Sequence, residues 1–283
     1  MSRLALETTI LTHGVPRDSA LPLARELRRI AEENGAEPAL VGVYRGVPVA
    51  SLSEAQLIEI LATADVPKAN SANLGVLMQR GSHASTTVAA TMEIAAASGI
   101  LMFSTGGIGG VHKGFAKHLD ISADLLALTR FPVAVVASGV KSILDVAATR
   151  EVLETLGVPV IGFRTDAFPA FYLRDSGVGV DARFDDPSEL ARFVRAELER
   201  TRRGLLIANP IPVEAELDSG DFARWLATAE NAVGPSALGR NATPSLLGKL
   251  HEVSGGATLR ANLDLIRSNT ALGARLASHL SGH

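Results

Sequence analysis

Short apolar runs alternate along the chain with longer segments whose apolar residues recur at helical spacing. A short apolar run between turn signals predicts a buried strand, and apolar residues three and four apart predict an amphipathic helix. The predicted strands are residues 4–11, 38–44, 47–52, 99–103, 131–138, 158–163, 177–184 and 204–210. The predicted helices are residues 19–35, 53–64, 85–99, 141–157 and 186–203, and residues 222–283 are expected to be largely helical.

Several of the predicted helices carry end signals. Gly35 closes the first, Ser53 is the expected N-cap of the second, and Asp186 or Ser188 caps the last of the five. Strand and helix in alternation indicate an α/β fold with a mainly parallel sheet and flanking helices. Because the sequence contains no fixed-period repeat, low-complexity tract or linker, residues 1–283 are expected to form a single domain.

In open parallel sheets, ligands bind beyond the carboxyl ends of the strands. The residues that follow the apolar runs LAL, GILMF, AVVAS and LLIA of these strands are therefore the candidates for a site. They are Glu7, the glycine-rich stretch 105–114, residues 139–141 with Lys141, and Asn209.

Composition excludes some classes of protein. The 283 residues are 47% hydrophobic and 20% charged and contain no cysteine, so a disulfide framework and a thiolate metal site are both ruled out. A net charge of −3 argues against binding nucleic acid by phosphate neutralisation. The basic run at residues 200–203 is interpreted as the end of a helix. The most apolar stretch, residues 88–103, is interrupted by Glu93 and Gly99, so we predict core rather than a membrane span.

The stretch TGGIGGVHKG, residues 105–114, has five glycines directly after a predicted strand. It matches neither the nucleotide P-loop nor the dinucleotide fingerprint in any register. Backbone N–H groups of such a turn can form a nest that binds an anion. A tight turn without a ligand explains the glycines equally well, and the sequence leaves the two interpretations open.

Asp120 and Asp124 lie four residues apart and would share one face of a helix. Carboxylates are the ligands that Mg²⁺ and Mn²⁺ favour. Taken alone, the simpler interpretation is that one aspartate caps a helix and the other is solvated. His13 and His112 are interpreted as structural hydrogen-bonding residues rather than metal ligands.

Lys141 stands at the end of a predicted strand and the start of a predicted helix. Desolvation and the positive helix end would both lower the pKa of its amine, and an uncharged lysine attacks carbonyl carbons. Glu7, among apolar neighbours, is a candidate general acid with a raised pKa. A surface lysine and an outward-facing strand residue are the simpler alternatives.

Five segments taken in order carry a resemblance over nearly the whole chain. The segments are ALETTILTHGVP, TGGIGGVHKG followed by DISADL, ASGVKSILD, LETLGVPVIGF and ANPIP. Together they resemble the pseudouridine-5′-phosphate glycosidase family, which includes indigoidine synthase A-like proteins. The resemblance implies a three-layer α/β/α fold. It also implies reversible cleavage of the C–C bond between C1′ of ribose 5-phosphate and C5 of uracil.

The resemblance also implies roles for individual residues. Lys141 is the implied nucleophile, which holds the opened sugar as a Schiff base, and Glu7 is the implied proton donor. Asp120 is the implied ligand of Mn²⁺ or another divalent cation. The implied substrate-binding residues are Lys68, Val88, Ser122, Asp124 and Asn262. A cytoplasmic homotrimer that binds a sugar phosphate and a base, with no membrane partner, is the implied setting.

The chain departs from the family pattern near Lys68. Ala72 and Asn73 replace an Arg-Asp pair, Ser85 interrupts a Gly-Ala-Thr-Thr segment, and Lys113 replaces arginine. These changes leave open an alternative function, a C-glycosynthase that joins ribose 5-phosphate to a ring other than uracil. A Schiff-base aldolase and a non-catalytic sugar-phosphate binder are further alternatives.

Overall fold

The computed structural model describes residues 2–115, 119–233 and 242–280. Within them ten strands form one sheet in the order β4-β5-β2-β1-β6-β7-β10-β8-β9, with β3 paired to β2. The strands are β1 Arg3–Glu7, β2 Glu37–Tyr44, β3 Val47–Val49, β4 Lys68–Ala69, β5 Ala84–Thr86, β6 Met102–Ser104, β7 Ala134–Ala137, β8 Val160–Phe163, β9 Ala182–Phe184 and β10 Leu205–Ala208.

The central pairings of the sheet are parallel. β1 pairs with β2 and β6, β7 with β6 and β10, and β8 with β10 and β9, all in parallel, whereas β2 pairs with β3 and β5 antiparallel. The short strands β6, β7, β8 and β10 are buried along their whole length, as expected for strands covered on both faces. The predicted mainly parallel α/β sheet is confirmed.

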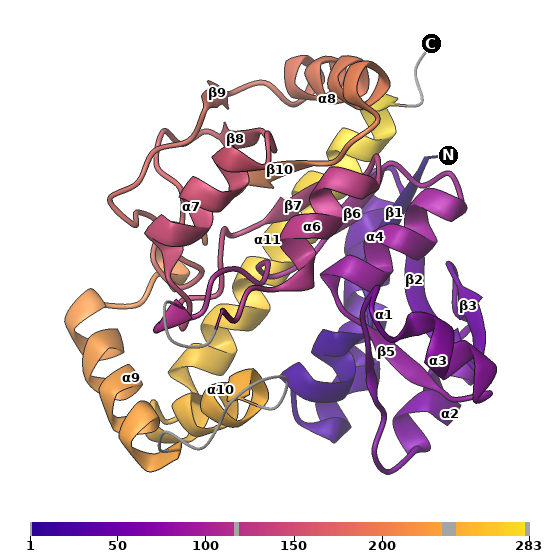
Figure 1. The fold of residues 1–283 in the computed structure, drawn as a ribbon, viewed down its shortest axis with the longest axis horizontal. Helices are drawn as coiled ribbons and strands as arrows, with labels where there is room; N and C mark the ends of the chain where they lie inside the picture. Colours follow the sequence, from indigo (N-terminus) through magenta and orange to yellow (C-terminus); the bar gives the residue numbers. More distant parts are fainter. Residues whose placement is uncertain (1, 116–118, 234–241, 281–283) are drawn as a thin grey trace.

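Helices cover both faces of the sheet, which gives three layers (Figure 1). Helices α1, α8 and α11 pack together on one face, and α4 and α6 pack together on the other, where Figure 1 also shows α7. Helices α9 and α10 pack against each other beside one end of α11. The helices are η1 Ile10–Gly14, α1 Arg17–Glu33, α2 Glu54–Ala62, α3 Leu74–Gln79, α4 Val88–Ala97, α6 Ala123–Arg130, α7 Val146–Thr155, α8 Pro187–Thr201, η2 Val213–Ala215, α9 Ser219–Val233, α10 Ala242–Val253 and α11 Ala257–Leu280.

Local signals that depend on one or two residues were confirmed. Ser53 caps α2 in a full capping box with Gln56, and Asp186 caps α8. The structure also has a turn at Arg45–Gly46 with positive φ at both residues, as a tight hairpin between β2 and β3 needs. The predicted C-terminal helices are present over the described part of residues 222–283, and residues 234–241 and 281–283 lie outside the described residues.

Several predicted boundaries were wrong, and three of these lie beside the candidate site residues Glu7, Val88 and Lys141. β1 ends at Glu7 rather than residue 11, and a π-helical turn follows at Ile10–Gly14. The predicted helix 85–99 begins only at Val88, because residues 84–86 form β5. The predicted helix 141–157 begins at Val146, where the Asp145 carboxylate accepts a hydrogen bond from the Ala148 amide. Lys141 therefore does not lie at a helix N-terminus.

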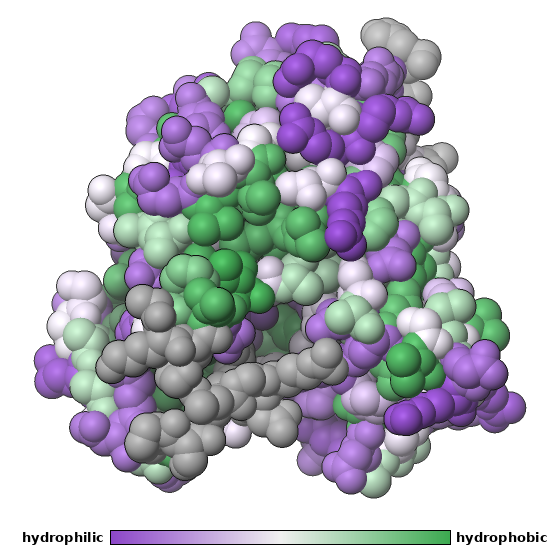
Figure 2. Space-filling view, viewed as in Figure 1, coloured by the Kyte–Doolittle hydropathy of each residue, from purple (hydrophilic) through white to green (hydrophobic). Residues whose placement is uncertain are grey.

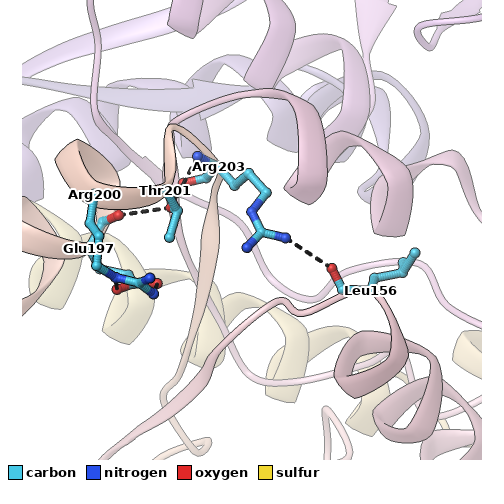
Figure 3. Close-up of polar contacts among 5 residues, drawn as sticks. All are labelled: Leu156, Glu197, Arg200, Thr201 and Arg203. Atoms are coloured by element: carbon cyan, nitrogen blue, oxygen red, sulfur yellow. Dashed lines mark hydrogen bonds and ion pairs between the residues drawn. The ribbon is translucent and has the colours of Figure 1, made fainter.

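Residues of the basic run at the end of α8 form hydrogen bonds within the folded protein. Arg200 forms two hydrogen bonds to the Glu197 carboxylate, at 2.9 and 2.7 Å. Thr201 donates to the Glu197 carbonyl, and Arg203 donates to the Leu156 carbonyl in the turn before β8 (Figure 3). These contacts fit the prediction that the run ends a helix. Among the described residues, no helix is both long and apolar enough to cross a membrane.

Candidate active site

A cavity of two adjoining chambers lies at the carboxyl ends of the central strands. The larger chamber has a volume of about 320 Å³ and the smaller about 70 Å³. Both are lined by Glu7, Thr9, Lys68 and Lys141, which therefore stand at the junction. The larger chamber is also lined by Asn70, Thr87, Val88, Gly109, His112, residues 120–124 and Leu144. The smaller is also lined by Ile10, His13, Gly14, Thr105, Gly106, Gly107, Phe171, Leu247 and Asn262.

Glu7 is the last residue of β1 and is buried, with an exposed fraction of 9%. Its Oε1 accepts a short hydrogen bond from the Thr105 hydroxyl at the end of β6. Burial raises the pKa of the carboxyl group, and Lys141, Thr105 and Lys68 oppose that change without cancelling it. Glu7 is therefore suited to hold and deliver a proton, as the sequence predicts for a general acid.

Lys68 opens β4, and Lys141 follows β7. Burial and the neighbouring charge of Lys141 lower the pKa of Lys68 to about 8, and the Glu7 carboxylate acts in the opposite direction. The backbone of Lys141 is fixed by the hydrogen bond that its amide donates to the Ile108 carbonyl, at 3.1 Å. Two amines thus face the same junction, each from a different strand end.

Two departures from the family pattern lie beside Lys68. The Asn73 side chain accepts from the Asn70 amide at 2.7 Å and donates to the Lys68 carbonyl at 2.9 Å. An aspartate at this position could accept the first bond but could not donate the second. Ser85 is fully buried and pairs with Lys68 across β4 and β5. Both substitutions are therefore part of the support for Lys68.

The glycine-rich stretch packs closely against side chains from other segments of the chain. A Cβ on Gly107 would lie 2.5 Å from the Phe171 ring, and a Cβ on Gly109 would collide with Ser122. A Cβ on Gly110 would collide with Thr149 in the same way. These glycines have no positive φ, so close packing rather than a turn explains them. The Gly109 amide donates a hydrogen bond to the Asp124 carboxylate at 2.8 Å. At this residue, the amide that could bind an anion in the predicted nest is therefore already bonded to a carboxylate of the protein.

The segment 120–124 combines a cap, a structural carboxylate and an accessible one. Ser122 caps α6. Asp124 lies in the first turn of that helix, and its oxygens accept from the Gly109 and Ala89 amides. Asp120 precedes the helix, so the two aspartates do not share a helix face. Asp124 joins the glycine-rich stretch to the start of α4.

Asp120 has the chemistry to hold a hydrated divalent ion. Its side chain is 37% exposed, and its Oδ2 lies 3.7 Å from Nδ1 of His112. The described residues contain no group of three or more acidic or histidine side chains placed around a common metal site. A single carboxylate on the cavity wall fits an ion that keeps most of its waters, as Mg²⁺ and Mn²⁺ do.

All eight residues to which the family resemblance assigned a role line this cavity. They are Glu7, Lys68, Val88, Asp120, Ser122, Asp124, Lys141 and Asn262. The geometry brings them together, and their individual roles remain predictions. His13 and His112, which we interpreted as structural, also line it, and His13 contacts the Val66 carbonyl at 3.0 Å.

Asn209 does not line the cavity but joins a buried network. Its amide donates to Oδ1 of Asn269 on α11, at 2.8 Å. Asn269 in turn donates to the Thr105 carbonyl at 2.8 Å and to the Ser138 hydroxyl at 3.1 Å. This network ties the ends of β6, β7 and β10 to one helix. Sequence reasoning missed Asn269 and Phe171, because polar and aromatic residues inside amphipathic or loop segments carry no periodic signal.

Comparison with known proteins shows which family the chain belongs to. Residues 2–279 match the family model described as indigoidine synthase A like protein. The pseudouridine-5′-phosphate glycosidase of Saccharopolyspora erythraea is 43% identical, over 99% of this chain and 93% of the relative. The enzyme of that name from Jannaschia sp. is 46% identical, over 98% and 93%.

Two solved structures share the fold. An indigoidine synthase A-like protein from Thermotoga maritima superposes with a TM-score of 0.92, at 35% identity, over 99% of this chain and 94% of that one. The prealnumycin C-glycosynthase AlnA, solved with ribulose 5-phosphate, gives a TM-score of 0.90 at 34% identity, over 99% and 92%. The chain belongs to the indigoidine synthase A-like family.

Proposed function

We propose that this protein reversibly cleaves pseudouridine 5′-phosphate to uracil and ribose 5-phosphate. One observation carries the proposal: Glu7 and Lys141 face the junction of two chambers. A reaction that makes or breaks a bond between a sugar carbon and a ring carbon needs an electron sink and a proton donor at such a junction. The names of relatives 40–46% identical to this chain support the same reaction.

In the cleavage direction, the Nζ of Lys141 adds to C1′, and the ring oxygen leaves and takes up a proton from that nitrogen. The bond between C1′ and the base carbon then breaks. The base carbon keeps the electron pair and takes a proton from Glu7, while the nitrogen lone pair forms an iminium with C1′. Water hydrolyses the iminium to ribose 5-phosphate and restores the amine. The raised pKa of Glu7 keeps its proton available for this step.

The larger chamber suits the anionic sugar. Lys68 supplies positive charge at the junction, and Val88 and Ser122 begin two helices whose N-termini face that chamber. Asp120 would hold Mn²⁺ or another divalent cation, which supplies positive charge for the phosphorylated sugar when bound. The smaller chamber, with the Asn262 amide, would take the base.

A biosynthetic C-glycosynthase is the second candidate. The structural likeness to AlnA and the substitutions at Asn73 and Ser85 favour it. Release of uracil from pseudouridine 5′-phosphate in the presence of Mn²⁺ supports the glycosidase. Absence of release, together with ribosylation of another ring, would support the synthase.

The proposal predicts a covalent adduct at one lysine. With ribose 5-phosphate and borohydride, reduction should fix the sugar on Lys141, and trypsin no longer cuts after an alkylated lysine. Digestion should then yield a peptide of residues 131–150 that carries the sugar. Mass spectrometry checks this, and a Lys141→Arg variant should give no adduct. Lys68 is the matched control amine: an adduct in the peptide of residues 46–80 instead would contradict the proposed role of Lys141.

A homotrimer in the cytoplasm is the proposed setting, on the strength of the family resemblance. Apolar residues gather on the face that includes α6 (Figure 2), where Leu119, Ile121 and Leu126 are 74%, 40% and 45% exposed. An apolar surface of this kind is what subunit contacts cover. Light scattering would measure the mass in solution, and a monomer would contradict this assembly.

A further inference from the structure

One residue that lines the smaller chamber has no role in the sequence analysis or in the proposed reaction. Phe171 lines it, with only 4% of the residue exposed, beside Ile10 and Leu247. Its backbone has a φ of +61°, a conformation that is uncommon for a bulky residue. Such backbone strain persists where the surroundings enforce it, and it concentrates at functional sites.

Several contacts hold Phe171 in this conformation. Its amide donates to the Ser138 carbonyl at 2.9 Å, at the end of β7. Gly139, next along that strand end, has a φ of +72°, and a Cβ there would collide with the Pro169 carbonyl. The Tyr172 ring meets the Phe171 ring edge to face, with centroids 4.7 Å apart. The segment before β9 is thus locked against the strand end that carries Lys141.

The glycine-rich stretch is shaped to receive this ring. A Cβ on Gly107 would lie 2.5 Å from Cδ2 and 2.8 Å from Cε2 of Phe171, and a Cβ on Gly106 would lie 3.4 Å from Cε2. The ring therefore packs directly on the backbone of residues 106–107. Any side chain at Gly107 would displace the Phe171 ring from its present position in the chamber wall.

We propose that Phe171 is the residue that selects a flat aromatic ring as the base partner. This inference rests on the proposed function, because it assigns the smaller chamber to the base. The ring supplies a rigid apolar wall next to Glu7 and Lys141, and the Asn262 amide supplies the polar group that meets the edge of the base. Pockets for aromatic ligands combine flat apolar walls with a few polar groups in this way.

Substitution tests the assignment in the synthesis direction. Phe171→Leu and Phe171→Met keep an apolar side chain but remove the flat face. Each should raise the KM for uracil about tenfold, the size of a lost aromatic contact, while the KM for ribose 5-phosphate and its borohydride trapping on Lys141 stay unchanged. Phe171→Tyr keeps the face and should stay within about twofold of the wild-type KM for uracil. An unchanged KM for uracil in the leucine and methionine variants would overturn the proposal.

Two further measurements separate this role from folding and from the reaction itself. Phe168→Leu is the matched control, because Phe168 is fully buried in the same segment and does not line the chamber. It should leave the KM for uracil unchanged. In the unmodified protein, 5,6-dihydrouracil has the polar edge of uracil without a flat ring, and it should inhibit about tenfold more weakly than uracil. Equal inhibition would overturn the proposal, whereas sugar trapping by the wild type tests only the proposed function.

Discussion

At the scale of single residues, burial acts in opposite directions on the acid and the amine at the junction. It raises the pKa of Glu7 and lowers the pKa of Lys68 to about 8, because it disfavours the charged form of each. The mutual attraction of these groups opposes both changes but does not outweigh burial. Compared with the same groups in water, the Glu7 carboxyl group therefore holds its proton more tightly, and the Lys68 amine holds its proton less tightly.

The pKa of Lys68 predicts how substrate binding depends on pH. Below about pH 8 the amine is charged and attracts the phosphorylated sugar, and one unit above that value only about one tenth of it is charged. The phosphate stays doubly charged over this range. The KM for pseudouridine 5′-phosphate should therefore rise about tenfold between pH 7 and pH 9, and steady-state kinetics would measure it.

The Lys68→Arg variant serves as the control for this prediction. An arginine stays charged throughout that range, so the rise in KM should disappear even if binding is weaker overall. A rise that persists in the arginine variant would assign the pH dependence to another group.

At the scale of elements, sequence reasoning succeeded for several elements that carry a repeated pattern or a local signal, but it missed α6, which Ser122 caps. The amphipathic helices α1 and α8, the Ser53 capping box and the buried strands β7 and β10 are of this kind. β4 and β5, with two and three residues, are too short to show any alternation. They form through pairing in the folded sheet, where β5 lies between β4 and β2.

The site shows the same division between local signals and tertiary contacts. Glu7 and Lys141 could be predicted because they lie at or just after strand ends, and strand ends converge at one edge of a parallel sheet. The glycines at 107, 109 and 110 could be recognised as unusual, but their reason could not. It depends on Phe171, Ser122 and Thr149, which approach from other segments.

Helix α11 acts on the site through one buried residue. Asn269 is fully buried and hydrogen-bonds the ends of β6, β7 and β10, and Thr105 at the end of β6 bonds Glu7. Asn269→Leu would leave the Thr105 carbonyl and the Asn209 amide without this partner. The free energy of unfolding should fall by about 2–3 kcal/mol, which urea denaturation would measure.

The adjacent residue on the same helix provides a matched control. Thr270 is also fully buried, but its hydroxyl has no hydrogen-bond partner among the described residues. Thr270→Val should therefore be neutral or slightly stabilising. Because Asn269 is a positioning residue, its replacement should also alter the pH profile of cleavage through Thr105 and Glu7. A stability loss with an unchanged profile would limit Asn269 to a structural role.

At the scale of the whole molecule, the cavity gathers side chains from Glu7 to Asn262, from both helical layers and the sheet between them. The folded protein therefore contains a buried carboxyl group, and the ionised form of that group would be more stable in water than in this cavity. The Glu7 pKa is raised in the folded state, so the folded state binds this proton more tightly than the unfolded chain does. This contribution to stability is complete below about pH 4.5 and is lost as the pH rises through the raised value.

Glu7→Gln should therefore remove a destabilising contribution, that of the buried ionised carboxylate, which increases with pH. The amide can still accept the hydrogen bond from Thr105 but cannot ionise. The variant should be inactive in cleavage. Relative to the wild type, its free energy of unfolding should be higher at pH 8 than at pH 5.5, as urea denaturation at both pH values would measure. Glu37→Gln, at an exposed position in β2, should show no such difference. If the free energies of unfolding of the two variants depended on pH in the same way, burial of the Glu7 carboxyl group would not destabilise the folded protein at high pH.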